Sequence, residues 1–154
     1  MENLQELVAE ITHVLQDKPV TKELQNFLND EFPPESDVFQ QIQALCKRGM
    51  EEGWLGKYEA EGLRYGRVIK PSPQTHGHSV DVVLMKDMKG PYHIHPTGEI
   101  DMVFPLDETA AFDGQGLGWK VYSAGSGHYP TVRGGEAIVL YLLPNGEIEF
   151  TKPK

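Results

Sequence analysis

The spacing of apolar residues changes near residue 53, and this change limits the possible folds more than any other feature. Before it, apolar residues recur every three or four positions, as in Leu4, Val8, Ile11 and Leu15, which is typical of amphipathic helices. After it, glycine, proline and asparagine separate short runs rich in valine, isoleucine and tyrosine. Such runs favour β-strands, so the chain is predicted to be mainly β with an α-helical N-terminal segment.

Residues 1–53 are predicted to form three helices. Pro19 interrupts the first apolar stripe, and Thr21 is placed to cap a short second helix. Ser36 or Asp37 can cap a third helix, which Gly53 is expected to end. This segment buries too little apolar surface to stand as a separate domain, so we expect it to pack on a β core formed by residues 54–154, or on a second subunit.

The second part of the chain contains seven predicted strands. They lie near residues 64–70, 79–86, 90–95, 99–105, 118–123, 136–143 and 147–151. Residues 144–146 (PNG) predict a tight hairpin turn, and Asp113-Gly114 predicts a second turn. Short strands at regular spacing indicate a sandwich or a barrel.

Composition narrows the class of protein. A length of 154 residues predicts one domain. The single cysteine excludes an intrachain disulfide and favours a cytoplasmic location. A net charge of -9 disfavours nucleic acid and anionic membrane surfaces as partners, because both are polyanions. The chain has no run of 18 apolar residues, and its first residues lack the basic and apolar parts of a signal peptide. We therefore expect a soluble cytoplasmic protein.

Four residues have the spacing of a metal site. His93 and His95 are two apart and would project from the same face of a strand. A turn at residues 96–98 then leads to Glu99, whose carboxylate an adjacent antiparallel strand can bring beside both imidazoles. His128 follows a glycine-bearing turn and can supply a third nitrogen. Imidazole and carboxylate ligands suit a divalent first-row metal. The alternative is a barrel that keeps this pattern and binds no metal.

Two motifs resemble those of the cupin superfamily. Residues 90–99 (GPYHIHPTGE) resemble its first motif, a glycine followed by H-x-H-x-x-x-E, and residues 123–128 (SAGSGH) resemble its second, P-x-G-x-x-H. Ser123 replaces the usual proline, and the spacing before His93 is shorter than usual. The resemblance implies a cupin-type β-barrel (jelly roll), a divalent transition metal (iron, manganese, nickel or zinc) on His93, His95, Glu99 and His128, and a homodimer.

A wider resemblance is to one cupin group, the 4-hydroxylaminobenzoate lyases. The stretches that carry it are residues 52–55 (EGWL), 64–68 (RYGRV), 79–83 (SVDVV), 95–101 (HPTGEID), 130–132 (PTV) and 139–144 (VLYLLP). The resemblance implies a carbon–nitrogen lyase of nitroaromatic degradation, which converts 4-hydroxylaminobenzoate to 3,4-dihydroxybenzoate and releases ammonia. Its partner would be a small aromatic acid substrate.

Four further residues are candidates for this chemistry. Asp101 shares a strand face with Glu99 and can carry protons, or it can orient a histidine ligand. A substrate carboxylate calls for an arginine, and Arg64 and Arg67 flank Tyr65 in a predicted strand. Since Arg64 and Arg67 are three apart, at most one of them is expected inside the barrel.

Other readings of the sequence remain open. His76 and His78 can line the mouth of a pocket, but solvation in a loop is the simpler expectation. A cupin dioxygenase acting on a small aromatic or thiol substrate is an alternative to the lyase. A non-catalytic cupin that binds a small ligand is another.

Overall fold

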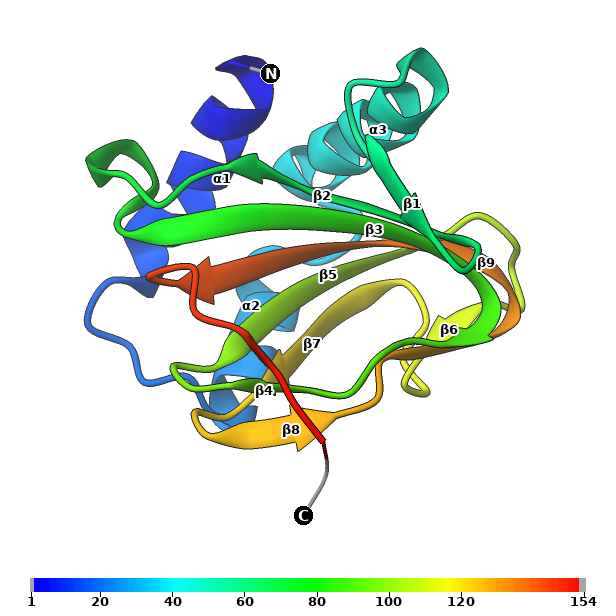
Figure 1. Cartoon of the computed structure of the whole chain (residues 1–154). Helices are drawn as coiled ribbons and strands as arrows, with labels where there is room; N and C mark the ends of the chain where they lie inside the picture. Colours follow the sequence, from blue (N-terminus) through cyan, green and yellow to red (C-terminus); the bar gives the residue numbers. More distant parts are fainter. Residues whose placement is uncertain (1, 153–154) are drawn as a thin grey trace.

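The computed structural model describes residues 2–152 and has three layers (Figure 1). Three helices cover one face of a large sheet, and a small sheet lies across the other face. The helices are α1 (Glu2–Leu15), α2 (Lys22–Glu31) and α3 (Asp37–Glu52). The remaining elements are β1 (Tyr58–Ala60), β2 (Leu63–Ile69), η1 (Pro73–Thr75), β3 (His78–Lys89), β4 (His93–His95), β5 (Glu99–Pro105), β6 (Ala111–Phe112), β7 (Gly118–Tyr122), β8 (Ser126–His128), β9 (Thr131–Pro144) and β10 (Glu149–Phe150).

The two sheets form an open jelly roll. The large sheet has the order β1-β2-β3-β9-β5-β7, with β6 also paired to β9, and the small sheet has the order β10-β4-β8. All of these pairs are antiparallel. Between residues 2 and 152 no ladder of hydrogen bonds joins one sheet to the other. The predicted jelly roll is therefore confirmed, but its sheets do not close into a continuous barrel.

Strand β5 shows how the layers are organised. Ile100, Met102 and Phe104 are buried against the helices, whereas Glu99 and Asp101 face the small sheet. This alternation follows from the period of two along a strand. One core thus lies between the helices and the large sheet. The inner face of the sheet carries a second, smaller apolar cluster, which includes Val83, Val103 and Val139, beside the buried carboxyl groups of Glu99 and Asp101.

The helix ends are close to those predicted. The hydroxyl of Ser36 accepts a hydrogen bond from the Phe39 amide (3.4 Å), which caps α3. Gly53 ends this helix in the left-handed conformation, with a φ of 85°. Thr21 occupies the cap position of α2, but its side chain makes no capping hydrogen bond. None of the helices in residues 2–152 combines the length and the apolar character needed to cross a membrane.

The hairpin predicted at residues 144–146 is wrong, although the turn itself is present. Asn145 and Gly146 both have positive φ, and the Gly146 amide donates to the Leu143 carbonyl. The next strand, β10, pairs with β4 and not with β9. Both edges of β9 are already occupied by β3 and β5, so the chain has to cross to the small sheet. The short strands β1, β6 and β8 were not predicted; β8 occupies part of the expected glycine turn.

Candidate metal centre and adjoining pocket

The four predicted metal ligands come together between the two sheets. Strand β4 carries His93 and His95, β5 begins with Glu99, and β8 ends with His128. The pairing of β4 with β8 places His93 directly opposite His128. One donor atom from each of the four residues lies within 4.8 Å of the others. Strand alternation and pairing therefore produce the cluster that the spacing suggested.

The donor atoms of this cluster fit a cation. Nε2 of His93 lies 3.0 Å from Glu99 Oε1, and Nε2 of His128 lies 3.3 Å from Glu99 Oε2. Nε2 of His95 is buried and has no hydrogen-bond partner within residues 2–152. A buried polar atom without a partner is unfavourable, and a bound metal ion would satisfy it. Three imidazoles and a carboxylate are a suitable donor set for a divalent first-row metal.

Without a metal ion, the charges of Glu99 and His128 favour an ion pair. Burial favours the neutral form of Glu99, but hydrogen bonds with His128 and His93 outweigh it and hold the pKa of Glu99 well below its usual range. Burial likewise opposes the charged form of His128, yet hydrogen bonds with Asp113 and Glu99 raise its pKa to about 9. Glu99 is thus an anion at neutral pH, which is the form that binds metal ions, whereas His128 carries a proton that a metal ion has to displace.

Asp101 lies on the same face of β5 as Glu99 and is fully buried. Its burial, followed by the negative charge of Glu99, raises the pKa of Asp101 well above the usual value. Neither of its carboxyl oxygens has a hydrogen-bond partner in the part of the chain that is described. The protonated acid is therefore the favoured form, and this geometry does not support the alternative that Asp101 orients a histidine ligand.

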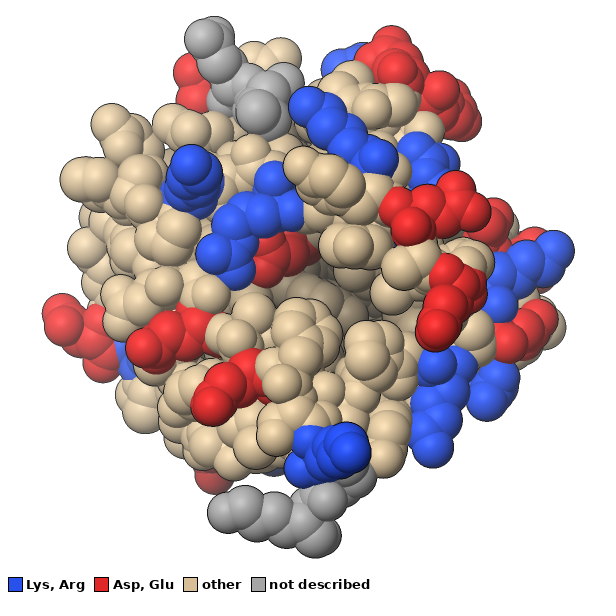
Figure 2. Space-filling view, in the orientation of Figure 1, with Lys and Arg blue, Asp and Glu red and all other residues tan. Residues whose placement is uncertain are grey.

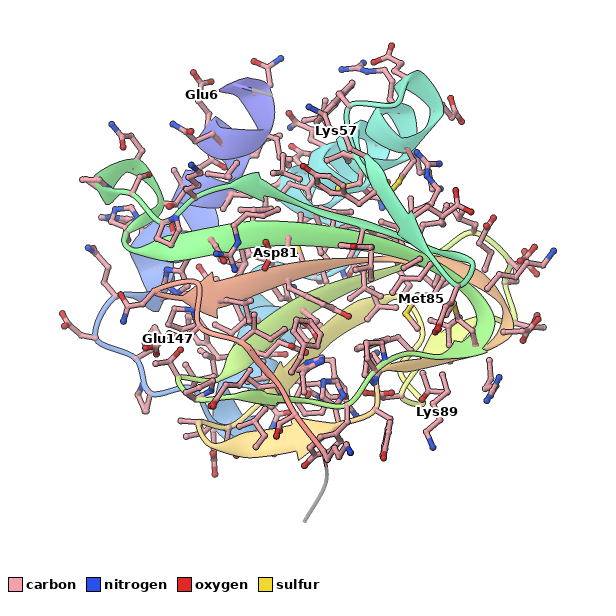
Figure 3. The ribbon with its side chains drawn as sticks, in the orientation of Figure 1. Glu6, Lys57, Asp81, Met85, Lys89 and Glu147 are labelled. Atoms are coloured by element: carbon pink, nitrogen blue, oxygen red, sulfur yellow. The ribbon has the colours of Figure 1, made fainter. Side chains whose placement is uncertain are left out.

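A cavity of about 690 Å³ adjoins the cluster, and His93 is the ligand that forms part of its wall. The surface is hollowed at the middle of this face of the molecule (Figure 2). Asp81 and Met85 both reach the cavity from β3, where they are four residues apart (Figure 3). Most of the lining is apolar and includes Leu63, Val83, Met85, Met88, Ile148 and Phe150. Such a lining suits a flat aromatic ligand.

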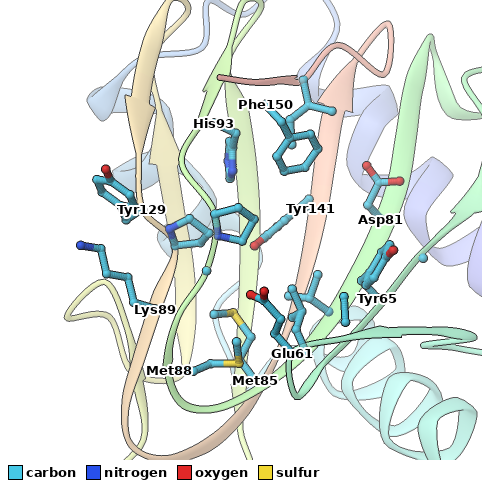
Figure 4. Close-up of a pocket in the computed structure, with 18 of the residues that line it drawn as sticks. Glu61, Tyr65, Asp81, Met85, Met88, Lys89, His93, Tyr129, Tyr141 and Phe150 are labelled. Carbon is cyan, nitrogen blue, oxygen red and sulfur yellow. The ribbon is translucent and has the colours of Figure 1, made fainter. Parts of the chain in front are cut away.

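Tyr141 is a cavity residue that the sequence analysis missed. Its ring is buried, and its hydroxyl points into the cavity (Figure 4). In the large sheet Tyr141 is paired with Asp81 on one side and with Asp101 on the other. Burial, followed by the nearby carboxylates of Glu99 and Asp101, raises the pKa of Tyr141 well above its usual value. The hydroxyl therefore keeps its proton and can donate a hydrogen bond.

The three predicted substrate-binding residues divide between the two faces of β2. Tyr65 and Arg67 line the cavity. Arg64 projects from the other face, where its guanidinium donates to the carbonyl oxygens of Met50, Leu55 and Gly56. The structure therefore does not bring Arg64 to the cavity, because its side chain holds the chain after α3. At most one of the two arginines faces inward, as the spacing of three predicted.

His76 and His78 lie away from the cavity. Nδ1 of His76 is 2.8 Å from the Thr12 hydroxyl of α1, and Nδ1 of His78 is 3.2 Å from the Thr75 carbonyl oxygen. The expectation of loop solvation is wrong for His78, which is buried because η1 packs against α1. Burial lowers the pKa of His78.

Comparison with known proteins places the chain in a family. A family model described as "PnbB: 4-hydroxylaminobenzoate lyase" matches residues 6–150. The chain belongs to the 4-hydroxylaminobenzoate lyase family. The 4-hydroxylaminobenzoate lyase of Pseudomonas putida is 35% identical over 153 residues, covering 88% of this chain and 87% of the relative. The enzyme of the same name from Nocardioides sp. (strain LMS-CY) is 36% identical over 145 residues, covering 88% and 86%.

One solved structure supports the fold over nearly the whole chain. A chain from the structures of the DMSP lyases RdDddP and RnDddQII covers 98% of both chains with a TM-score of 0.55 and 14% identity. An RmlC-like cupin protein from Ralstonia eutropha covers 60% of this chain and 62% of its own, with a TM-score of 0.45 and 16% identity. The predicted cupin jelly roll and the predicted enzyme of the carbon–nitrogen lyase class are confirmed.

Proposed function

We propose that this enzyme converts 4-hydroxylaminobenzoate to 3,4-dihydroxybenzoate and ammonia, and that it needs a divalent first-row transition metal (iron, manganese, nickel or zinc). The observation that carries the proposal is the buried group of His93, His95, Glu99 and His128 beside a largely apolar cavity. The names of the two relatives support the substrate.

The balance of the reaction matches such a site. One molecule of 4-hydroxylaminobenzoate and one of water contain the same atoms as one molecule of 3,4-dihydroxybenzoate and one of ammonia. The reaction therefore needs no external oxidant or reductant. A metal ion bound by the four ligands would supply Lewis-acid chemistry, which polarises an oxygen atom. The remaining requirements are to bind the ring and to move protons.

Side chains around the cavity can meet both requirements. Apolar residues such as Val83 and Phe150 would cover the faces of the ring and exclude water. Tyr141 would donate its hydroxyl hydrogen bond to the hydroxylamino group, since its proton is firmly held. Asp101 lies next to Tyr141 in the paired strands but does not line the cavity. We assign Asp101, whose protonated form is favoured, the supply of protons to the reaction.

The other end of the substrate carries a carboxylate. Arg67 is the arginine that faces the cavity, and Tyr65 projects from the same face of β2. A guanidinium matches the geometry of a carboxylate and remains charged at every relevant pH. We therefore assign Arg67, assisted by the Tyr65 hydroxyl, to the substrate carboxylate.

Anaerobic turnover tests this function. Metal-free protein is loaded separately with iron(II), manganese(II), nickel(II) or zinc(II) and incubated with 4-hydroxylaminobenzoate under argon. Stoichiometric ammonia and 3,4-dihydroxybenzoate are expected with at least one metal. Absence of ammonia with all four metals refutes the lyase proposal. Turnover that consumes oxygen supports the dioxygenase alternative, and binding without turnover supports a ligand-binding cupin.

The expected homodimer and the cytoplasmic location are part of the same proposal. The homodimer rests on the common behaviour of cupins, and light scattering on the purified protein tests it. The cytoplasmic location is supported by a single cysteine, Cys46, which is buried and free. Fractionation of the producing cells tests the location.

A further inference from the structure

We propose that Asp113 is a positioning residue, which holds the proton of His128 on Nδ1 and so presents Nε2 to the metal. The inference rests on the metal dependence proposed above. It starts from the 2.6 Å contact between Asp113 Oδ2 and His128 Nδ1. Sequence analysis recognised Asp113 only as part of a turn, because 15 residues separate it from His128.

The backbone of Asp113 is held firmly in place. Phe112 and Gln115 exchange two backbone hydrogen bonds of 2.8 Å across the turn. The Asp113 amide donates to the Thr131 carbonyl (2.8 Å), which ties the turn to the start of β9. Since β8 and β9 are separated by only two residues, this anchor also lies close to His128. The carboxylate is therefore directed at the imidazole by a rigid backbone.

The Asp113 carboxylate accepts three hydrogen bonds. Oδ1 accepts from the Thr131 amide (2.9 Å), and Oδ2 accepts from both His128 Nδ1 and the Tyr122 hydroxyl. The ring of Tyr122 also lies against the imidazole of His128, with 4.2 Å between the ring centres. The hydrogen bond to Asp113 and the ring contact with Tyr122 thus together fix the orientation of the His128 imidazole.

This arrangement selects one tautomer of His128. A carboxylate can only accept hydrogen bonds, so the neutral imidazole has to carry its proton on Nδ1. The lone pair is then on Nε2, which faces Glu99 and His93. Partners of this kind orient metal-bound histidines and raise their affinity for the metal. Asp113 would therefore act through His128 without touching the substrate.

Replacing Asp113 by asparagine should reverse this selection. The Thr131 amide is a donor, so it will hold the asparagine oxygen at the position of Oδ1. The asparagine NH₂ group then faces His128 Nδ1, which has to become an acceptor. The proton of the neutral ring moves to Nε2 and blocks the metal-binding lone pair. The change keeps the size and shape of the side chain, so a steric effect is avoided.

The test measures metal affinity and the position of the proton. Zinc affinity is determined by competition with a chelator for the wild type, Asp113→Asn and a control, Asp107→Asn. Asp107 also accepts a backbone hydrogen bond, from the Glu136 amide at 2.7 Å, but within residues 2–152 it accepts none from an imidazole. We expect Asp113→Asn to bind zinc about 10- to 100-fold more weakly and the control to match the wild type.

Nitrogen-15 NMR of the zinc-loaded wild type is the second measurement, and it does not depend on the folding of a variant. It should show His128 protonated at Nδ1, in a hydrogen bond, with zinc on Nε2. Unchanged zinc affinity in a folded Asp113→Asn protein, or a proton-free Nδ1 in the wild type, overturns this inference and leaves the lyase proposal intact. If the wild type binds no zinc, iron, manganese or nickel, both proposals fall.

Discussion

The guanidinium of Arg67 forms a two-point ion pair with Asp81, with Nε 2.7 Å from Oδ1 and Nη2 3.1 Å from Oδ2. Nη2 also donates to the Gly146 carbonyl at 2.9 Å. The pair therefore links β2, β3 and the turn after β9 on the wall of the cavity. It holds the Arg67 side chain in one position before any substrate arrives.

Removal of Arg67 should weaken substrate binding. We expect Arg67→Met to raise KM for 4-hydroxylaminobenzoate about 10- to 100-fold, since a hydrogen bond to a charged group contributes about 1.5–3 kcal/mol. Phenylhydroxylamine, which lacks the carboxylate, should bind to the variant and the wild type equally well. The double variant Arg67→Met/Asp81→Asn serves as a control, because removing Arg67 alone leaves the Asp81 carboxylate without its partner. An equal loss for both substrates would show that Arg67 does not recognise the carboxylate.

Metal binding should stabilise the folded protein. A metal present at 100 times its Kd adds about 2.7 kcal/mol to the free energy of unfolding, and a chelator should remove this gain. The variant His95→Ala should lose the metal-dependent shift in Tm, because the buried Nε2 of His95 is one of the proposed donor atoms. His13→Ala, on the surface of α1, serves as the control. A full shift in His95→Ala would exclude His95 as a ligand.

Asp101→Asn should separate proton transfer from metal binding. Because Asp101 favours its neutral form, the neutral asparagine should preserve the fold and the metal content. We expect kcat to fall at least about 100-fold, within the range that acid–base groups contribute. Metal analysis and steady-state kinetics on the same preparation check this. If Asp101→Asn retains its metal and turns over at the full rate, Asp101 does not transfer protons in the reaction.

Tyr141→Phe removes one hydroxyl from the cavity wall. The ring is buried between β3 and β5, so the variant should keep its stability and its metal. We expect kcat to fall about 2- to 13-fold, in line with a lost hydrogen bond of about 0.5–1.5 kcal/mol to a neutral group in the reacting complex. A matched variant, Tyr65→Phe, should affect KM more than kcat. If Tyr141→Phe instead changes mainly KM and Tyr65→Phe mainly kcat, then Tyr65 contacts the reacting group and Tyr141 the substrate carboxylate.

His78 should make stability depend on pH. Burial lowers the pKa of His78 in the folded protein, whereas the unfolded chain binds the proton near the ordinary pKa of about 6.5. The unfolded state therefore binds more protons below that pH, so stability is lost as the pH falls below about 6.5. Urea unfolding of metal-free protein between pH 8 and pH 5 should show a smaller loss for His78→Asn than for the wild type. His13→Asn should behave like the wild type.

Local patterns in the sequence were enough for much of the fold and for three of the proposed ligands, whereas His128 also needed the resemblance to the second cupin motif. The strand predicted at residues 99–105 has the same bounds as β5, and Gly53 ends its helix as expected. His93, His95 and Glu99 converge because strand alternation and a short turn act over only seven residues. These features depend on neighbours along the chain, so periodicity and turn residues reveal them.

Only the tertiary structure decided how the site is completed. Pairing of β2, β3, β9 and β5 sets Arg67, Asp81, Tyr141 and Asp101 in one row across the sheet. Asp113 reaches His128 because β6 and the start of β9 are paired. The burial of His78 and the partner of β10 also follow from packing between distant segments. Strand pairing joins residues that are far apart in the sequence, and the register of each pair, which local spacing does not contain, determines which side chains meet.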